Sequence, residues 1–179
     1  MNKLTSTIIV IILIFLNSTF TFAQESKLKL NSSSLSLGVG LIDSSFDNSR
    51  GGFNISLDIS TKLNKNLISF YLNSGSQLKV FDAGAEEEYT EINATYGREI
   101  ELNSWIKVEG HIGLGFFNYS VKNRSTDWKT EKESTIGFPF RVKLIFYTSK
   151  HFGIGINPNM NLNSLVNIYS GNIIFQYKF

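Results

Sequence analysis

The chain has 179 residues, enough for one domain with a real core, and its formal net charge is only +2. No basic run with interleaved aromatic residues is present and there is no cysteine, which excludes a typical nucleic-acid-binding surface, disulfide bonds and a cysteine-linked lipid anchor. Aromatic residues reach 13% and prolines number two, and together with abundant Asn, Ser and Gly this composition favours strands and turns.

The first segment differs from the rest of the chain. Lys3 precedes an apolar run over 8–16, and the small residues Thr21 and Ala23 follow. This order is typical of a secretory signal peptide, and the apolar run is shorter than the about 20 residues of a membrane-spanning helix. An uncleaved anchor is the alternative. The expected division is a cleaved signal peptide over 1–23, a periplasmic lead-in over 24–32 and a β-domain over 33–179.

Beyond the signal peptide, apolar residues recur with a period of two, which predicts strands. In the first such stretch Leu35, Leu37 and Val39 alternate with serine and glycine. The stretches are longer than the about 5–6 residues usual in soluble proteins and suit the about 9–11 residues of a transmembrane strand. Eight are expected, over 34–42, 53–63, 67–74, 89–97, 105–117, 135–147, 151–162 and 167–179.

The connections between these stretches alternate in length. The first, third and fifth are long and polar, whereas the second, fourth and sixth are shorter. An outer-membrane barrel has long outward loops and short periplasmic turns, so this alternation is the expected one. The long connections cover 43–51, 75–88 and 119–134, and the shorter ones cover 61–66, 97–103 and 148–150.

The two faces of the predicted strands differ in charge. The apolar parity carries no Asp, Glu, Lys or Arg, as lipid contact requires, because a charge there costs about 2–4 kcal/mol at mid-depth. The other parity is rich in Ser, Gly and Asn and carries charges of both signs, which can pair inside a closed lumen. We predict an all-β fold, a closed antiparallel eight-stranded up-and-down transmembrane β-barrel. Its predicted lumen charge network comprises Asp58, Glu91, Lys107, Glu109, His111, Arg141 and Lys143.

Aromatic residues gather at both ends of the apolar face, as the two interface girdles of a membrane barrel would. The predicted periplasmic girdle is Tyr96, Phe146, Phe152, Tyr177 and Phe179, and the predicted outer girdle is Phe53, Phe116, Phe138 and Tyr169.

Three residues fit this scheme less well. Pro139 and Pro158 lie within strands, where each removes a ladder donor, so we expect them at a rim or a bulge. Trp105 falls on the lumen parity, which indicates that the fifth strand begins later or carries a bulge.

The signal peptide, the eight alternating stretches, the connections and the terminal phenylalanine resemble small OmpA/OmpX-type outer-membrane β-barrels. The letters "TYGRE", read as a turn after the fourth strand, and "IGFPFRV" in the sixth are similar to proteins of the outer membrane protein beta-barrel domain group. The resemblance implies a monomer surrounded by outer-membrane lipid in a Gram-negative cell envelope. It also implies an insertion signal in the last strand that the barrel-assembly machinery reads, at Ile173, Phe175, Tyr177 and Phe179.

Two functions from different classes follow. The first is a non-enzymatic surface barrel with a filled lumen, no aqueous pore, and outer loops whose ligand the sequence does not identify. The alternative is a lipid-modifying enzyme of deacylase or acyltransferase type. A deacylase of this kind has His and Ser two residues apart, but His111 and His151 are followed at that spacing by Gly113 and Gly153. A soluble periplasmic β-sandwich or lipocalin-like binder also alternates in this way.

Metal binding has little support in the sequence. Three glutamates at 86–88 follow Asp82 in a long loop, where acidic runs are usually solvated rather than ligands of calcium. We therefore expect no metal ion and no cofactor.

Overall fold

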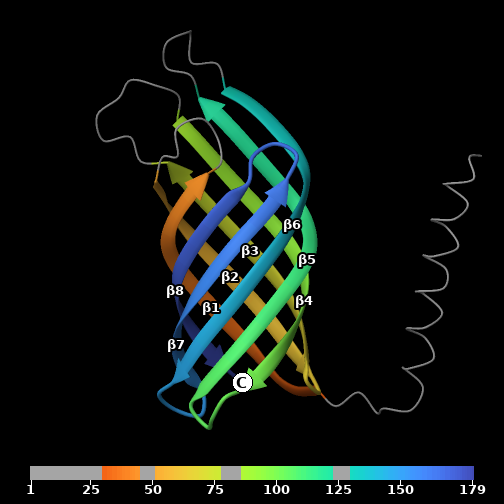
Figure 1. Ribbon diagram of the computed structural model, residues 1–179, viewed down its shortest axis with the longest axis vertical. Helices are drawn as coiled ribbons and strands as arrows, with labels where there is room; N and C mark the ends of the chain where they lie inside the picture. Colours follow the sequence, from red (N-terminus) through yellow and green to blue (C-terminus); the bar gives the residue numbers. More distant parts are fainter. Residues whose placement is uncertain (1–29, 45–50, 78–85, 123–129) are drawn as a thin grey trace, which may run out of the picture.

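The computed structural model describes residues 30–44, 51–77, 86–122 and 130–179. These residues form eight antiparallel strands in one closed barrel, in which each strand pairs with its neighbours in sequence (Figure 1). The predicted fold is therefore confirmed. The predicted signal peptide over 1–23 lies outside the described residues, and no helix in the described part of the chain could cross a membrane. The strands are β1 (Leu30–Ser44), β2 (Gly52–Leu63), β3 (Asn66–Gln77), β4 (Glu86–Glu101), β5 (Ile106–Lys122), β6 (Thr130–Tyr147), β7 (Phe152–Asn163) and β8 (Ile168–Lys178).

Pairing of the first and last strands closes the barrel. Their register runs from Ser34 opposite Lys178 to Ser44 opposite Ile168. One step further out, Phe179 N donates to Ser33 O at 2.9 Å and Ser33 N donates to Phe179 O at 3.1 Å. No strand edge is then left along this seam, as a barrel in lipid requires.

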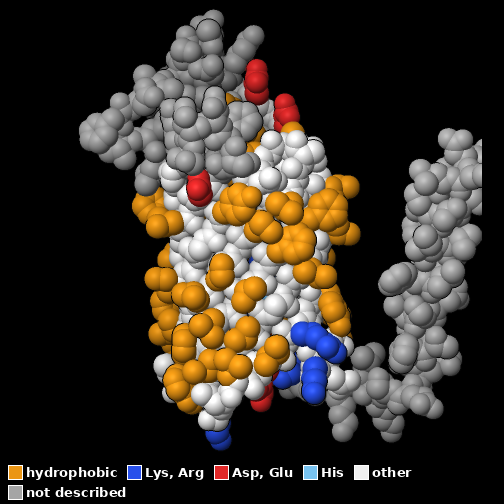
Figure 2. Space-filling model, viewed as in Figure 1, with side chains coloured by type: hydrophobic (Ala, Val, Ile, Leu, Met, Phe, Trp, Pro, Cys, Tyr) orange, Lys and Arg blue, Asp and Glu red, His pale blue; other side chains and the backbone are white. Residues whose placement is uncertain are grey.

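The wall of the barrel is apolar outside and polar inside. On β1, the side chains of Leu37 and Val39 are more than half exposed, whereas Ser36, next to Leu37 and on the opposite face, is buried. Figure 2 shows orange side chains over the middle of the wall, with the visible charged side chains near its two ends. A soluble sandwich or a lipocalin-like barrel would have the reverse polarity, with its apolar face inside.

The predicted girdle aromatics all lie on the outer wall. Pairs of rings pack along it: Phe152 lies 6.4 Å from Phe175, and Tyr177 lies 6.3 Å from Phe179, measured between ring centroids. The exposed aromatics include Phe53, Tyr96, Phe116, Phe138, Phe146, Phe152, Tyr169, Tyr177 and Phe179. Aromatic rings on a lipid-facing wall are suited to the membrane interfaces.

The three longest strands extend well beyond the stretches that the sequence predicted. β4, β5 and β6 have 16, 17 and 18 residues. β4 takes in 86–88 of the connection predicted over 75–88, and β5 and β6 take in 119–122 and 130–134 of the connection predicted over 119–134. The predicted glutamate loop at 86–88 is therefore the beginning of β4, while Asp82 lies outside the described residues. The polar ends of these strands lack the period-of-two signal although their backbone pairing continues.

The turns at the other end also differ in detail. The letters "TYGRE" lie within β4, which continues to Glu101, so the predicted turn at this position is wrong. β5 begins at Ile106, as the parity of Trp105 indicated, and that exposed indole lies in the turn 6.0 Å from the Phe146 ring. β1 begins at Leu30, within the predicted lead-in, and its register shifts between Leu30 and Ser32.

The prolines occupy strand interiors without a bulge, contrary to the expectation of a rim or a bulge. Pairing of β5 with β6 skips Pro139, and pairing of β6 with β7 skips Pro158, but the register is the same on either side of each gap. A proline cannot donate to the ladder, so each gap is local. The long flanking ladders keep the strands aligned across it.

The outer wall yields a first prediction. We expect Ile112→Arg, which places a cation near the middle of the exposed face of β5, to lower the unfolding free energy in lipid vesicles by about 2–4 kcal/mol. Ile100→Arg, next to the periplasmic end of β4, is the matched control and costs about 0–1 kcal/mol. Denaturant titration of the vesicle-folded protein measures both, and equal costs would contradict the lipid-facing assignment.

Candidate functional site

A balanced cluster of four charged side chains lies at the centre of the lumen. Arg141 Nη1 donates to Asp58 Oδ2 at 2.7 Å, and Lys143 Nζ lies 2.7 Å from the same oxygen. Lys143 Nζ is also 3.2 Å from Glu109 Oε2. All four side chains are almost completely buried, so two acids neutralise two bases away from bulk water.

Strand register and parity bring these groups together. Arg141 and Lys143 are two residues apart on β6 and therefore face the same side. On β5, Glu109 lies opposite Lys143 and His111 lies opposite Arg141. Asp58 reaches them from β2, across the lumen. The cluster consequently ties β6 to a strand that is not its neighbour.

On the side away from Asp58, the Arg141 guanidinium contacts two hydroxyls and an aromatic ring. Its Nη2 donates to Ser69 Oγ at 2.9 Å and to Thr95 Oγ1 at 3.1 Å. Its centre lies 3.9 Å from the Tyr71 ring centroid, a cation–π distance. Ser69, Thr95 and Tyr71 were not among the predicted site residues, although all three share the lumen parity.

His111 lies between a hydroxyl and a carboxylate. Its Nε2 is 3.2 Å from Glu109 Oε2, and its Nδ1 is 3.4 Å from Thr95 Oγ1. The ring fits because Gly97 lies opposite it in the ladder, where a Cβ would come within 2.6 Å of Nδ1. The sequence prediction did not include Thr95, because this residue lies on the adjacent strand, 16 positions from His111, where no short spacing connects the two.

This order of hydroxyl, imidazole and carboxylate resembles that of a nucleophilic triad. Its surroundings oppose that chemistry. Thr95 Oγ1 also lies 2.6 Å from Ser69 Oγ, and it accepts from Arg141. Only 4% of Thr95 is exposed, so a substrate carbonyl has no route to the hydroxyl.

Glu91 lies apart from the charged cluster, in a cage of asparagine amides. Side-chain N–H groups of Asn73, Asn93, Asn159 and Asn161 converge on its two carboxylate oxygens, three of them at 2.8, 3.0 and 3.1 Å. Glu91 itself is fully buried. Amide donors thus solvate this charge in place of a cation.

Lys107 lies in a third group, at the periplasmic end. Its Nζ is 3.2 Å from Glu99 and 2.6 Å from Glu101, and Lys62 Nζ lies 2.5 Å from Glu99. Lys107 also lies 5.6 Å from the Tyr147 ring centroid. The seven predicted lumen residues therefore divide into the four members of the central cluster with His111 beside them, the separate Glu91 cage and the Lys107 group.

Gln176 links the periplasmic group to the central cluster. Its Nε2 donates to Tyr147 Oη at 2.9 Å and to Glu109 Oε1 at 3.3 Å, while Lys143 Nζ donates to its Oε1 at 3.4 Å. A void beside Gln176 and Lys178 has a volume of only about 10 Å³, close to the minimum for one water. Side chains fill this part of the lumen.

Within the described ranges, no three His, Asp or Glu side chains are grouped so that they could hold a metal ion. The two acids of the central cluster already have cationic partners, and Glu91 is enclosed by amides. The chemistry that the lumen offers is thus charge compensation and hydrogen bonding across the barrel.

Comparison with solved structures finds several bacterial outer-membrane proteins. Neisserial surface protein A aligns with a TM-score of 0.66 and 13% identity over 82% of this chain and 95% of its own. Ail of Yersinia pestis gives 0.63 and 14% over 84% and 100%, and OprG of Pseudomonas aeruginosa gives 0.60 and 10% over 85% and 97%. No protein-family model and no curated protein sequence matches the chain.

The central cluster yields a second prediction. We expect Asp58→Asn to lower the unfolding free energy by about 3–5 kcal/mol, because Arg141 and Lys143 then share one fewer buried acid. Denaturant titration in vesicles measures the loss. The double variant Asp58→Asn with Lys143→Met restores the charge balance and should recover part of it. Strictly additive losses would contradict a coupled network.

Proposed function

We propose that this chain, an eight-stranded outer-membrane β-barrel of the OmpA/OmpX type, is a non-enzymatic envelope protein that presents its outer end to partners at the cell surface. The observation that supports this is the lumen, whose buried charges are paired across the barrel and leave no described channel through its centre. The barrel then serves as an anchor, and the ligand of the outer connections is a partner outside the membrane.

The runner-up function is modification of outer-membrane lipid. Among the described residues, its best candidate is the relay of Thr95, His111 and Glu109. This relay points into the filled lumen, whereas the acyl chains of a lipid substrate would lie against the outer wall. The geometry therefore favours the non-enzymatic role.

Lipid mass spectrometry discriminates the two functions. We expect deletion of the gene to leave the lipid A mass spectrum unchanged, because no described nucleophile and base lie together on the lipid-facing wall. The comparison strains carry the wild-type gene or His111→Gln on a plasmid. A shift by the mass of one acyl chain, reversed by the wild type and not by His111→Gln, would establish the enzymatic alternative.

We also propose that the last strand carries the insertion signal for the barrel-assembly machinery. Ile173, Phe175, Tyr177 and Phe179 all point outward, where a receptor could read them before lipid covers them. His151 stacks on Tyr177 at 5.9 Å, and its Nδ1 lies 2.8 Å from Lys178 O, so the strand end is held in place. The closed barrel has paired edges, which supports a monomer.

Phe179→Ala tests the signal role, since it keeps the backbone pair with Ser33. We expect the heat-modifiable fraction in outer membranes to fall severalfold, while unassisted folding into lipid vesicles changes little. Phe138→Ala, which removes an exposed aromatic from β6, is the control and should assemble normally in cells. An equal defect of Phe179→Ala in cells and in vesicles would reduce the residue to an interface anchor.

A further inference from the structure

One row of outward-facing residues changes from apolar to polar as it crosses the barrel wall. Successive ladder partners lead from Val39 on β1 through Ile55 and Ser74 to Thr90, then to Asn118 and Ser134 on β6. We call these six residues the outer row. Its first two members are aliphatic, and its last four carry hydroxyl or amide groups.

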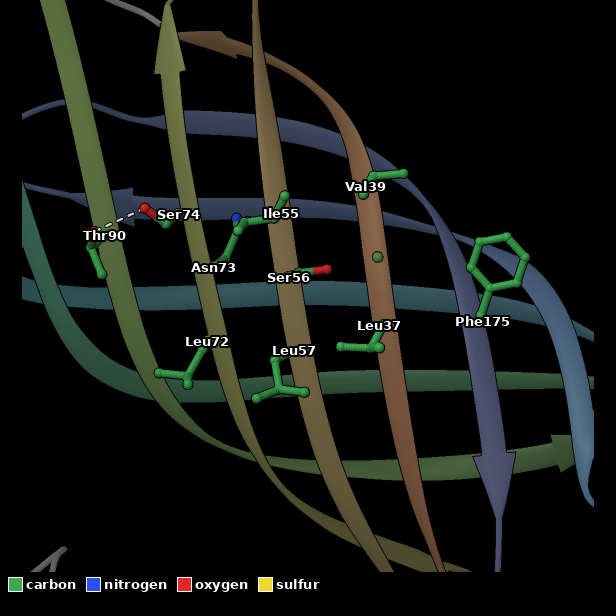
Figure 3. A pocket seen from close by; sticks show the side chains of 11 residues that line it. Leu37, Val39, Ile55, Ser56, Leu57, Leu72, Asn73, Ser74, Thr90 and Phe175 are labelled. Carbon is green, nitrogen blue, oxygen red and sulfur yellow. Dashed lines mark hydrogen bonds between the residues drawn. The ribbon is translucent and has the colours of Figure 1, made fainter.

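Two hollows follow this row. The first is a groove of about 510 Å³ across the outer face of β1, β2 and β3 (Figure 3), with Phe175 of β8 at one end and the hydroxyls of Ser74 and Thr90 at the other. Between those ends most of the lining is aliphatic, from Leu37, Val39, Ile55, Leu57 and Leu72. Gly38, Ser56 and Asn73 of the same three strands complete it.

The second hollow begins where the first one ends. It has a volume of about 580 Å³, lies across β4, β5 and β6, and shares Thr90 with the groove. Most of its other lining residues are polar. They include Glu88, Asn118, Ser120, Lys132, Glu133 and Ser134.

The hydroxyls at the junction are tied into the wall. Ser74 Oγ donates to Tyr89 O at 3.0 Å and lies 3.0 Å from Thr90 Oγ1, so the Thr90 hydroxyl donates to Ser74 and its oxygen can still accept. On the other side, Ser134 Oγ donates to Asn118 Oδ1 at 2.7 Å. The polar hollow is thus a preorganised surface.

The polar hollow lies further from the periplasmic turns than the apolar groove does. β5 and β6 have 17 and 18 residues against 12 for β2 and β3, and Figure 1 shows their outer ends at the top of the barrel. Below Asn118 and Ser134 the same outer face returns to Phe116 and Ile136. The row therefore crosses from the acyl-chain zone to the head-group zone of the outer leaflet.

We propose that the two hollows form one binding site for an outer-leaflet lipid with a phosphorylated saccharide head. One acyl chain lies in the groove along Leu57, and the head lies over β4–β6. There the Lys132 ammonium binds phosphate, and Thr90 and Asn118 hydrogen-bond saccharide hydroxyls. This inference rests on the membrane placement of the barrel and on no feature of its lumen.

An acid in the polar hollow selects the head group. Glu88 lies in the same hollow as Lys132 and on the outward parity of Thr90, whereas Glu133 is on the other parity, opposite the buried Tyr119. Carboxylates accept hydrogen bonds from saccharide hydroxyls, whereas they repel the bare phosphodiester of an anionic phospholipid. A hydroxyl-rich head with a phosphate therefore fits this mixed surface better than phosphatidylglycerol does.

Native mass spectrometry of the purified full chain tests the site. The detergent-solubilised protein is mixed with lipid A, phosphatidylglycerol or phosphatidylethanolamine at equal concentration. We expect one retained lipid A molecule and no comparable retention of either phospholipid. Leu57→Trp fills the groove and excludes the acyl chain, and Lys132→Gln removes the ammonium. Each should lower the retained fraction roughly tenfold, which for Lys132→Gln is the effect of one lost charge-assisted contact.

Matched controls separate the site from general lipid contact. Ile154→Trp adds the same indole to the exposed face of β7, and Lys150→Gln removes an exposed lysine from the turn before it. Both should retain lipid A like the wild type. Equal retention of all three lipids, or of lipid A by all four variants, would overturn the site and leave only annular lipid.

Heat-modifiable migration of each variant is recorded in the same samples. If Leu57→Trp and Lys132→Gln migrate normally and retain as much lipid A as the wild type, the lipid site is contradicted and the proposed anchoring function is not affected. Failure of the wild-type protein itself to show heat-modifiable migration would instead contradict the membrane barrel on which both proposals depend.

Discussion

The backbone's need for hydrogen-bond partners inside lipid controls the rest of this structure. A strand edge facing hydrocarbon would leave several N–H and C=O groups unsatisfied, so the sheet has to close on itself. Closure is made by β1 and β8, down to the paired backbone of Ser33 and Phe179. Once the wall is closed, one face of every strand contacts lipid and the other lines a narrow lumen. The outward side chains are therefore mainly apolar and the inward ones mainly polar.

A closed lumen concentrates charge where water is scarce, and this barrel compensates its charges in two ways. The central cluster sets Asp58 and Glu109 against Arg141 and Lys143, while Glu91 is solvated by asparagine amides. Glycines such as Gly115, opposite Asn93, leave room for the amide groups against the wall. A lumen built in this way braces the barrel and opposes conduction, which is consistent with an anchoring role.

Alternation revealed the strands wherever the two faces differ in polarity. It failed at the outer parts of β4, β5 and β6, because Thr90, Asn118 and Ser134 are polar on the outer face as well. Parity also found the inward charges but not their partners. Asp58 meets Arg141 across 83 positions of sequence, and Glu91 binds neutral amides, which carry no charge that a search for opposite signs could match. Contacts across the lumen depend on barrel geometry, which local patterns do not encode.

The bridge from β2 to β6 has a consequence for the order of assembly. Asp58 and Arg141 belong to strands that are not neighbours, so the bond between them can form only when the sheet has curled almost completely. Before the bond forms, Arg141 and Lys143 on β6 lack Asp58 as a partner and have to be hydrated. The inner face of an open sheet must therefore stay in contact with water while its outer face contacts lipid. The contact between Asp58 and Arg141, 83 positions apart, therefore belongs to the closed barrel and braces it only after the sheet has curled.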